Sequence, residues 1–207
     1  INTVTATDAD GDDVTFTVSG SEFAITSTGV LTFASAPDYE TKSSYTATVT
    51  AADGTNSTTQ DITVNVTDVN DVPVFTSGSI FSAAENQTAI GTVTATDDEG
   101  EGVTFTVSGS ELAITLAGVL TFASAPDYET KSSYTATVTA SDDTNSTSQE
   151  ITVNITDVNE VPVFTSSATF SAAENQTAIG TVTATDDDGD SVTFTVSGSE
   201  LEINSST

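Results

Sequence analysis

Acidic side chains return at regular places along the chain, and they are the residues best suited to carry out chemistry. The sequence has 31 Asp and Glu residues against two lysines, a net charge of −29, and no Cys, His, Met or Trp. Without Cys or His it has no zinc or copper site, no thiol nucleophile and no Ser-His-Asp triad. The chemistry that remains is carboxylate chemistry: binding of hard cations, or acid–base catalysis by paired acids.

The acids are bunched in four kinds of cluster. The first kind follows an alternating apolar run, the second follows a proline, the third is a single Asp after a Tyr-led run, and the fourth precedes a Val-Pro dipeptide. In that order they are Asp8 with Asp10, Asp97 to Glu99 and Asp186 to Asp188; Asp38 with Glu40 and Asp127 with Glu129; Asp53 and Asp142; and Asp68 with Asp71 and Asp157 with Glu160. Glu85 and Glu174 recur separately.

An internal repeat of 89 residues sets these positions. Residues 31–51 return unchanged at 120–140, and residues 81–98 return unchanged at 170–187. Such self-similarity is typical of repeat architectures. We therefore predict three repeats: 1–71 without its first strand, 72–160 complete, and 161–207 as the N-terminal half of a third. Trimming of a longer array explains the incomplete ends, and donation of the segment near Val163 to Ser171 to another copy is the alternative.

The elements that position the acids are short strands. Apolar residues alternate with Thr in runs such as 103–107, 134–140 and 151–155, which is typical of half-buried strands. An irregular first strand is expected from Val74 to Ala84, a second around Val93 and Ala95, and a hairpin around Ala117-Gly118. About seven strands per repeat predict an all-β fold: tandem seven-stranded Greek-key β-sandwiches (cadherin/Ig-like) stacked end to end.

Following these strands brings the acids to the two ends of each predicted sandwich. Stacked repeats would then bring several carboxylates together at each boundary, where they repel one another unless cations intervene. Ligands that offer only oxygen select Ca²⁺ over zinc or copper, and Mg²⁺ is disfavoured because it keeps its own waters. The pattern predicts calcium at the boundaries between repeats.

At this point the sequence resembles the cadherin superfamily over its whole length. The family's boundary motif DxNDN is matched by Asp68-Val69-Asn70-Asp71-Val72 and by Asp157-Val158-Asn159-Glu160-Val161. Its DxD motif is matched at Asp8 and Asp10 and at Asp186 and Asp188. Its PEN and DRE motifs are matched by Glu85-Asn86 and Glu174-Asn175, and by Asp38-Tyr39-Glu40 and Asp127-Tyr128-Glu129. The near-identical repeats without Cys are most similar to bacterial-type repeats of a large surface adhesin.

The resemblance implies three Ca²⁺ at each junction and a ligand set for each. At the first junction the ligands would be the side chains of Asp38, Glu40, Asn70, Asp71, Asp97, Glu99 and Asp142, with the carbonyls of Val69 and Val72. At the second they would be the side chains of Glu85, Asp127, Glu129, Asn159, Glu160, Asp186 and Asp188, with the carbonyls of Val158 and Val161.

Two positions depart from the family pattern, because Glu99 and Glu160 stand where the motifs have Asp. Two other interpretations of the acids stay open. They could be solvated loop residues, or Asp8-x-Asp10-x-Asp12 could form a self-contained calcium loop. The second interpretation is disfavoured because the middle repeat replaces that pattern with Glu99 and Glu101.

Composition and resemblance together set the expected function. Two lysines exclude nucleic acid as a partner, and no apolar run is long enough for membrane insertion. A glycosidase needs one cleft, whereas these acids recur in every repeat, so we expect no enzyme. We expect an extracellular, calcium-rigidified array that acts as the stalk of a cell-surface adhesin in cell adhesion or biofilm. The alternatives are the subunit of a polymeric filament or matrix, linked to other copies of itself, and a glycan-binding module of a secreted enzyme.

Overall fold

Two units built from β-strands make up the chain in a computed structural model that describes residues 2–204. The first unit comprises Ile1–Val72 with Asp97–Gly102, and the second comprises Pro73–Thr96 with Val103–Thr207. The described residues contain strands and no helix, so the all-β prediction is confirmed. None of them forms a helix that could span a membrane.

The first unit holds six strands in two three-stranded sheets. The strands are β1 (Asn2–Thr3), β2 (Thr15–Val18), β3 (Phe23–Ile25), β4 (Val30–Phe33), β5 (Ser44–Ala52) and β6 (Ser57–Asn65). One sheet has the order β1-β4-β3 and the other β2-β5-β6. Phe23, Phe33 and Tyr45 pack against one another between them, with ring centroids 5.0 to 6.1 Å apart.

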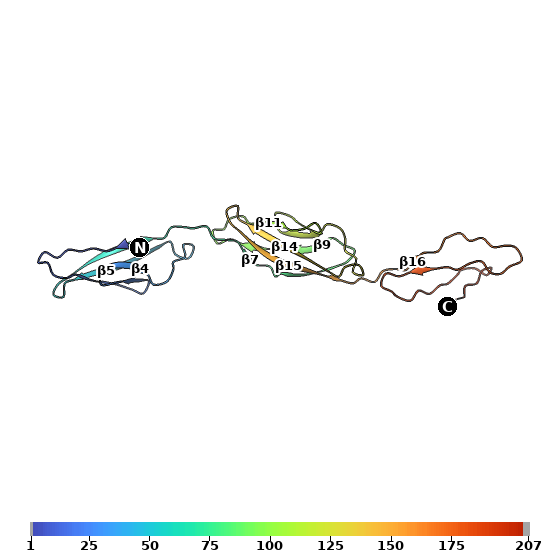
Figure 1. The fold of residues 1–207 in the computed structure, drawn as a ribbon, viewed down its shortest axis with the longest axis horizontal. Helices are drawn as coiled ribbons and strands as arrows, with labels where there is room; N and C mark the ends of the chain where they lie inside the picture. The colour runs from blue at the N-terminus through green and yellow to red at the C-terminus, as the bar shows by residue number, and fades with distance from the viewer. Residues whose placement is uncertain (1, 205–207) are drawn as a thin grey trace. The chain divides into compact units, whose positions relative to one another are not determined.

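The second unit contains most of the repeat predicted at 72–160, without Val72 and Asp97–Gly102. Its strands are β7 (Val74–Phe75), β8 (Ile80–Ala84), β9 (Ala89–Thr92), β10 (Ala95–Thr96), β11 (Thr104–Val107), β12 (Leu112–Ile114), β13 (Val119–Phe122), β14 (Ser133–Ser141) and β15 (Ser146–Thr156). A four-stranded sheet, β11-β14-β15-β8, lies against β12-β13-β9, and β7 pairs with β10. Figure 1 shows the long strands β14 and β15 side by side. Residues beyond 160 add β16 (Val163–Phe164) and β17 (Ala184–Thr185).

Alternation of side chains builds the core of this sandwich. Along β14, Val138 and Ala140 are fully buried while Thr139 between them is only half-buried, and Val153 of β15 is buried in the same way. Leu120 and Phe122 of β13 close the core from the other sheet. Thr is β-branched and suits the exposed face of a pleated sheet. The strand pattern predicted from the sequence therefore matches the observed core.

Gly118 shows why the predicted β12–β13 hairpin needs glycine. Its φ is +85°, and a Cβ built on it would lie 2.2 Å from the carbonyl oxygen of Val93. Its own carbonyl accepts a hydrogen bond from the amide of Val93. Any side chain would break this close approach, since both the conformation and the space exclude one.

The opening of the repeat differs from the prediction in two ways. The expected strand from Val74 to Ala84 divides, because β7 pairs antiparallel with β10 while β8 pairs in parallel with β15. Val93 was expected within a strand but lies between β9 and β10, because its amide donates to the carbonyl of Gly118 in the β12–β13 turn. Its side chain is buried. The boundaries proposed between repeats remain a prediction.

Candidate metal centres

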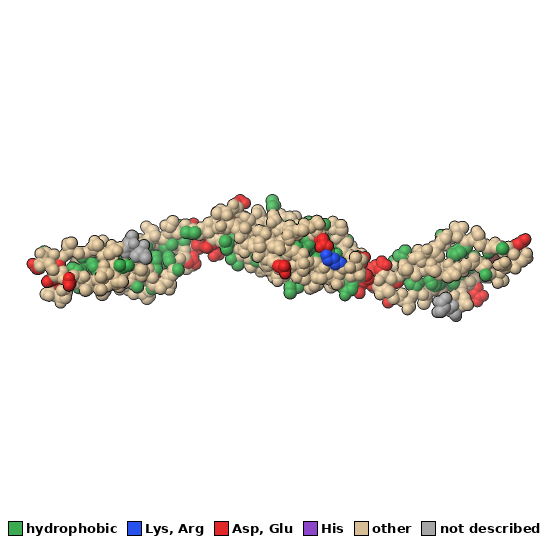
Figure 2. Space-filling view, in the orientation of Figure 1, with side chains coloured by type: hydrophobic (Ala, Val, Ile, Leu, Met, Phe, Trp, Pro, Cys, Tyr) green, Lys and Arg blue, Asp and Glu red, His purple; other side chains and the backbone are tan. Residues whose placement is uncertain are grey.

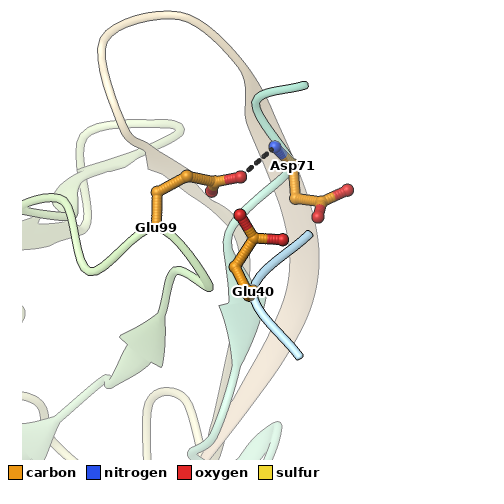
Figure 3. A group of neighbouring side chains, drawn as sticks. All are labelled: Glu40, Asp71 and Glu99. Carbon is orange, nitrogen blue, oxygen red and sulfur yellow. Dashed lines mark hydrogen bonds between the residues drawn. The ribbon is translucent and has the colours of Figure 1, made fainter. Parts of the chain in front are cut away.

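Three carboxylates meet within the first unit, and we call them the first acidic cluster: Glu40, Asp71 and Glu99. One oxygen of each lies within 4.8 Å of the others. The backbone amide of Asp71 donates a hydrogen bond of 3.1 Å to Glu99 Oε1. In Figure 3 the carboxylate of Glu40 points into the space between Glu99 and Asp71. Residues far apart in the sequence therefore converge on one small space.

The surroundings of this cluster oppose the charged form of Glu40. Desolvation raises the pKa of Glu40 above its ordinary value, and the carboxylates of Asp68 and Glu99 raise it further. Each effect disfavours the charged form of the acid. The cluster is therefore a place where a cation would be stabilised.

A second acidic cluster lies within the second unit and contains Glu85, Glu129, Asp157, Glu160 and Asp188. Oxygens of the first three lie within 4.8 Å of one another. Glu85 is 4% exposed, and its carboxylate accepts two backbone hydrogen bonds of 2.8 Å, from the amides of Tyr128 and Val158. Glu85 thereby joins the end of β8 to two other segments.

Glu160 and Asp188 complete this cluster. The backbone amide of Glu160 donates to Asp188 Oδ2 at 2.7 Å, and Asn86 Nδ2 donates to Glu160 Oε1 at 2.5 Å. The other carboxylate oxygen of Glu160 is buried and accepts no hydrogen bond from the described residues. A buried acceptor of this kind is costly unless something binds it.

The pKa values of the second cluster shift in the same direction as that of Glu40. Desolvation raises the pKa of Glu129, Asp157 and Glu160, and the surrounding carboxylates of Glu85 and Asp188 add to each shift. The hydrogen bond from Asn86 opposes the rise at Glu160. The protein thus holds several anions closer together than they would lie in free solution.

Asp38 and Asp127, both predicted ligands, bind their own turns in this structure. Each accepts a backbone and a hydroxyl hydrogen bond from the threonine three residues later, Thr41 or Thr130. These bonds lower the pKa of both acids. Among residues 2–204, neither belongs to a group of three acids that converge. Their role as ligands remains a prediction.

The other predicted ligands have separate surroundings. Asp142 is buried in the β14–β15 turn and accepts the amides of Thr144 and Asn145. Both carboxylate oxygens of Asp97 are buried, and Asp186 accepts the amide of Asp190. The side chains of Asn70 and Asn159 each donate to the carbonyl of the next residue. The valines whose carbonyls were predicted ligands are exposed: Val69, Val72, Val158 and Val161.

Asp157 was not among the predicted ligands, yet it lies in the second acidic cluster. The signal was present in the sequence, because Asp157 and Asp68 begin the two boundary motifs. The convergence of Asp157 with Glu85 and Glu129 becomes visible only when the strands are paired.

The residues present fit Ca²⁺ by the chemistry of their donors. Both clusters offer carboxylate oxygens with no nitrogen or sulfur ligand, which are the donors that Ca²⁺ prefers. The buried, unbonded oxygen of Glu160 is a further acceptor for a cation. Figure 2 shows acidic side chains gathered where the sandwich of β7–β15 gives way to the residues beyond 160.

Comparison with known proteins gives consistent matches. No protein-family model matches the chain. It is 34% identical over 197 residues to the protocadherin-like wing polarity protein stan of Drosophila melanogaster, covering 80% of this chain and 6% of that protein. It is 35% identical over 198 residues to protocadherin Fat 4 of Mus musculus, covering 83% of this chain and 4% of that protein. The chain therefore spans only a small part of the curated relatives it matches.

Solved structures agree in fold. Mouse protocadherin-24 EC1-3 matches with a TM-score of 0.54 and 25% identity, over 84% of this chain and 66% of that chain. Human protocadherin-24 EC1-2 matches with a TM-score of 0.55 and 22% identity, over 76% of this chain and 88% of that chain. The predicted sandwich fold is confirmed by these likenesses.

Proposed function

The chain belongs to the cadherin superfamily, and on this premise we propose that it is a calcium-rigidified repeat array serving as the stalk of a cell-surface adhesin. Its homologues are cadherin adhesion domains, and like them it is extracellular. Cadherin repeats generally bind Ca²⁺ and contribute to cell adhesion. The relatives are animal proteins, and the bacterial-type origin stays a prediction.

One observation carries the calcium proposal: the same contact occurs twice, 89 residues apart. The boundary amide of Asp71 donates to Glu99, and the boundary amide of Glu160 donates to Asp188. Each contact lies beside a glutamate from the preceding repeat, Glu40 or Glu129. Solvated loop acids have no reason to reproduce such an arrangement.

The ions would be held by the carboxylates of the two acidic clusters, with about three ions per junction implied by the family. Bound Ca²⁺ supplies the positive charge that the clustered acids lack. Each cluster draws its acids from three places: one repeat, the boundary motif that follows it, and the loop after the second strand of the next repeat. A set of ligands shared in this way resists bending, because bending would separate carboxylates from their ion on one side.

A thermal melt of the whole chain tests the proposal. In 10 mM CaCl₂ the melting temperature should exceed that in EGTA by roughly 5 °C or more, because extracellular modules bind Ca²⁺ at about 10⁻⁴ to 10⁻³ M. Mg²⁺ at the same concentration should restore little of this difference. Identical curves in Ca²⁺ and EGTA would refute calcium binding.

Electron microscopy of the purified chain in calcium tests the role as a stalk. Separate straight rods that become flexible in EGTA are the expected result. End-to-end polymers would instead support the polymeric filament, in which copies of the chain join one another.

A further inference from the structure

Two acidic positions differ between the junctions, and each adjoins a stretch that is otherwise unchanged; two further differences, Glu101 against Asp190 and Gly102 against Ser191, follow in the same loop. Residues 67–77 and 156–166 differ only at Asp71 and Glu160. Residues 81–98 and 170–187 are identical, and the first difference after them is Glu99 against Asp188. Each junction thus has one Asp and one Glu, and the two positions exchange them.

The structure places these two positions in contact at both junctions. The amide of Asp71 bonds to Glu99 at 3.1 Å, and the amide of Glu160 bonds to Asp188 at 2.7 Å. In one case the long side chain comes from the loop, and in the other it comes from the boundary. The hydrogen bond fixes how closely the carboxylate of the loop residue (99 or 188) approaches the boundary residue (71 or 160). The carboxylate of the boundary residue must then occupy the space that remains.

We propose that residues 71 and 99, and residues 160 and 188, are length-matched pairs that set the spacing of carboxylates at each junction. This inference rests on the proposed binding of Ca²⁺ by the same clusters. One glutamate per pair fills the space, since the long arm of Glu160 reaches Asn86 while the short arm of Asp188 reaches the amide directly. A second glutamate would crowd the carboxylates, and two aspartates would leave a gap of one methylene, a difference that packed sites register.

The matched pairs also make each junction specific for its partner. A loop that carries Glu fits a boundary that carries Asp, and a loop that carries Asp fits a boundary that carries Glu. Repeats of otherwise nearly identical sequence would thereby be distinguished at the junctions between them. This kind of discrimination works by mismatch as much as by attraction.

A double-mutant cycle in the whole chain tests the pairing at the second junction. The variants are Asp188→Glu, Glu160→Asp and the two combined, which recreates the pair found at the first junction. Calcium affinity is measured by isothermal titration calorimetry. Each single change should weaken binding at one junction by about tenfold, and the double variant should return to within about threefold of the original chain. Asp187→Glu, an exposed acid in the same loop, is the control and should have no effect.

The outcomes separate the pairing from calcium binding itself. Single variants that bind like the original chain, or a double variant whose loss is the product of the single losses, would overturn the pairing. If the original chain takes up no Ca²⁺, the proposed function fails, and the same cycle is then followed by urea unfolding in EGTA. Non-additive unfolding energies there would still support the matched pair, and additive ones would overturn it.

Discussion

At the scale of single residues, the hydrogen bonds of Glu85 hold together the segments around it. Its carboxylate is buried and accepts the amides of Tyr128 and Val158, so it ties together β8, the Asp127-Tyr128-Glu129 loop and the boundary. Hydrogen bonds to a charged acceptor are stronger than those between neutral groups. Glu85 therefore orders these segments before any ion is bound.

Replacing Glu85 by Gln should destabilise the chain even in EGTA. The amide group of Gln would turn a donor toward one of the two backbone N–H groups, leaving that donor unsatisfied at a cost of about 1–3 kcal/mol. Urea unfolding measures this loss. Glu174→Gln, at the equivalent but exposed position of the next repeat, is the matched control and should change the unfolding energy by less than about 0.5 kcal/mol. Equal effects at both positions would contradict the account.

At the scale of elements, the turn between the two longest strands differs between the repeats in its left-handed residue. The turn between β14 and β15 has Asp143 at a φ of +82°, whereas the equivalent turn between β5 and β6 has Gly54 at +92°. A left-handed conformation is strained for any residue with a side chain. The hairpin of the complete repeat therefore carries strain that the first repeat avoids.

Asp143→Gly should stabilise the complete repeat. Removing the side chain relieves the left-handed strain, and after the entropy cost of glycine a gain of about 0.5–1 kcal/mol is expected in urea unfolding. The reverse change, Gly54→Asp, should destabilise the first unit by a similar amount. A loss of stability in Asp143→Gly would show that the side chain makes a contact worth more than the strain.

At the scale of the whole molecule, pH and calcium act on the same carboxylates. The acids of the clusters have pKa values raised by desolvation above ordinary values of 4.5 for Glu129 and Glu160 and 3.8 for Asp157. In the absence of metal the native state then binds more protons than the unfolded state just above these values. Stability must fall as pH rises through that window.

Metal-free protein should therefore melt at a higher temperature at pH 5 than at pH 7. Below about pH 4 the trend should reverse, because Asp38 and Asp127 have lowered pKa values and lose their turn contacts when protonated. Thermal melts across this range provide the measurement. The variant with both Glu129→Gln and Glu160→Gln should show a smaller difference in melting temperature between pH 5 and pH 7. An equal difference would assign the effect to the overall charge of the chain.

The sequence by itself determined the β class, the repeat of 89 residues and most strands of the complete repeat. These follow from local alternation, as in 134–140 and 151–155, which each strand carries within its own few residues. The resemblance of its motifs to a known family also predicted ligand sets that include Glu40, Asp71 and Glu99 at one junction, and Glu85 and Glu129 at the other.

Only the tertiary structure decided which carboxylates converge and which bind their own turns. The parallel pairing of β8 with β15 brings Glu85 beside Asp157, residues 72 positions apart. The carboxylates of Asp38 and Asp127 instead accept hydrogen bonds from their own turns. Which carboxylates converge depends on how strands far apart in the sequence pair in space. The sequence pattern does not contain those distances.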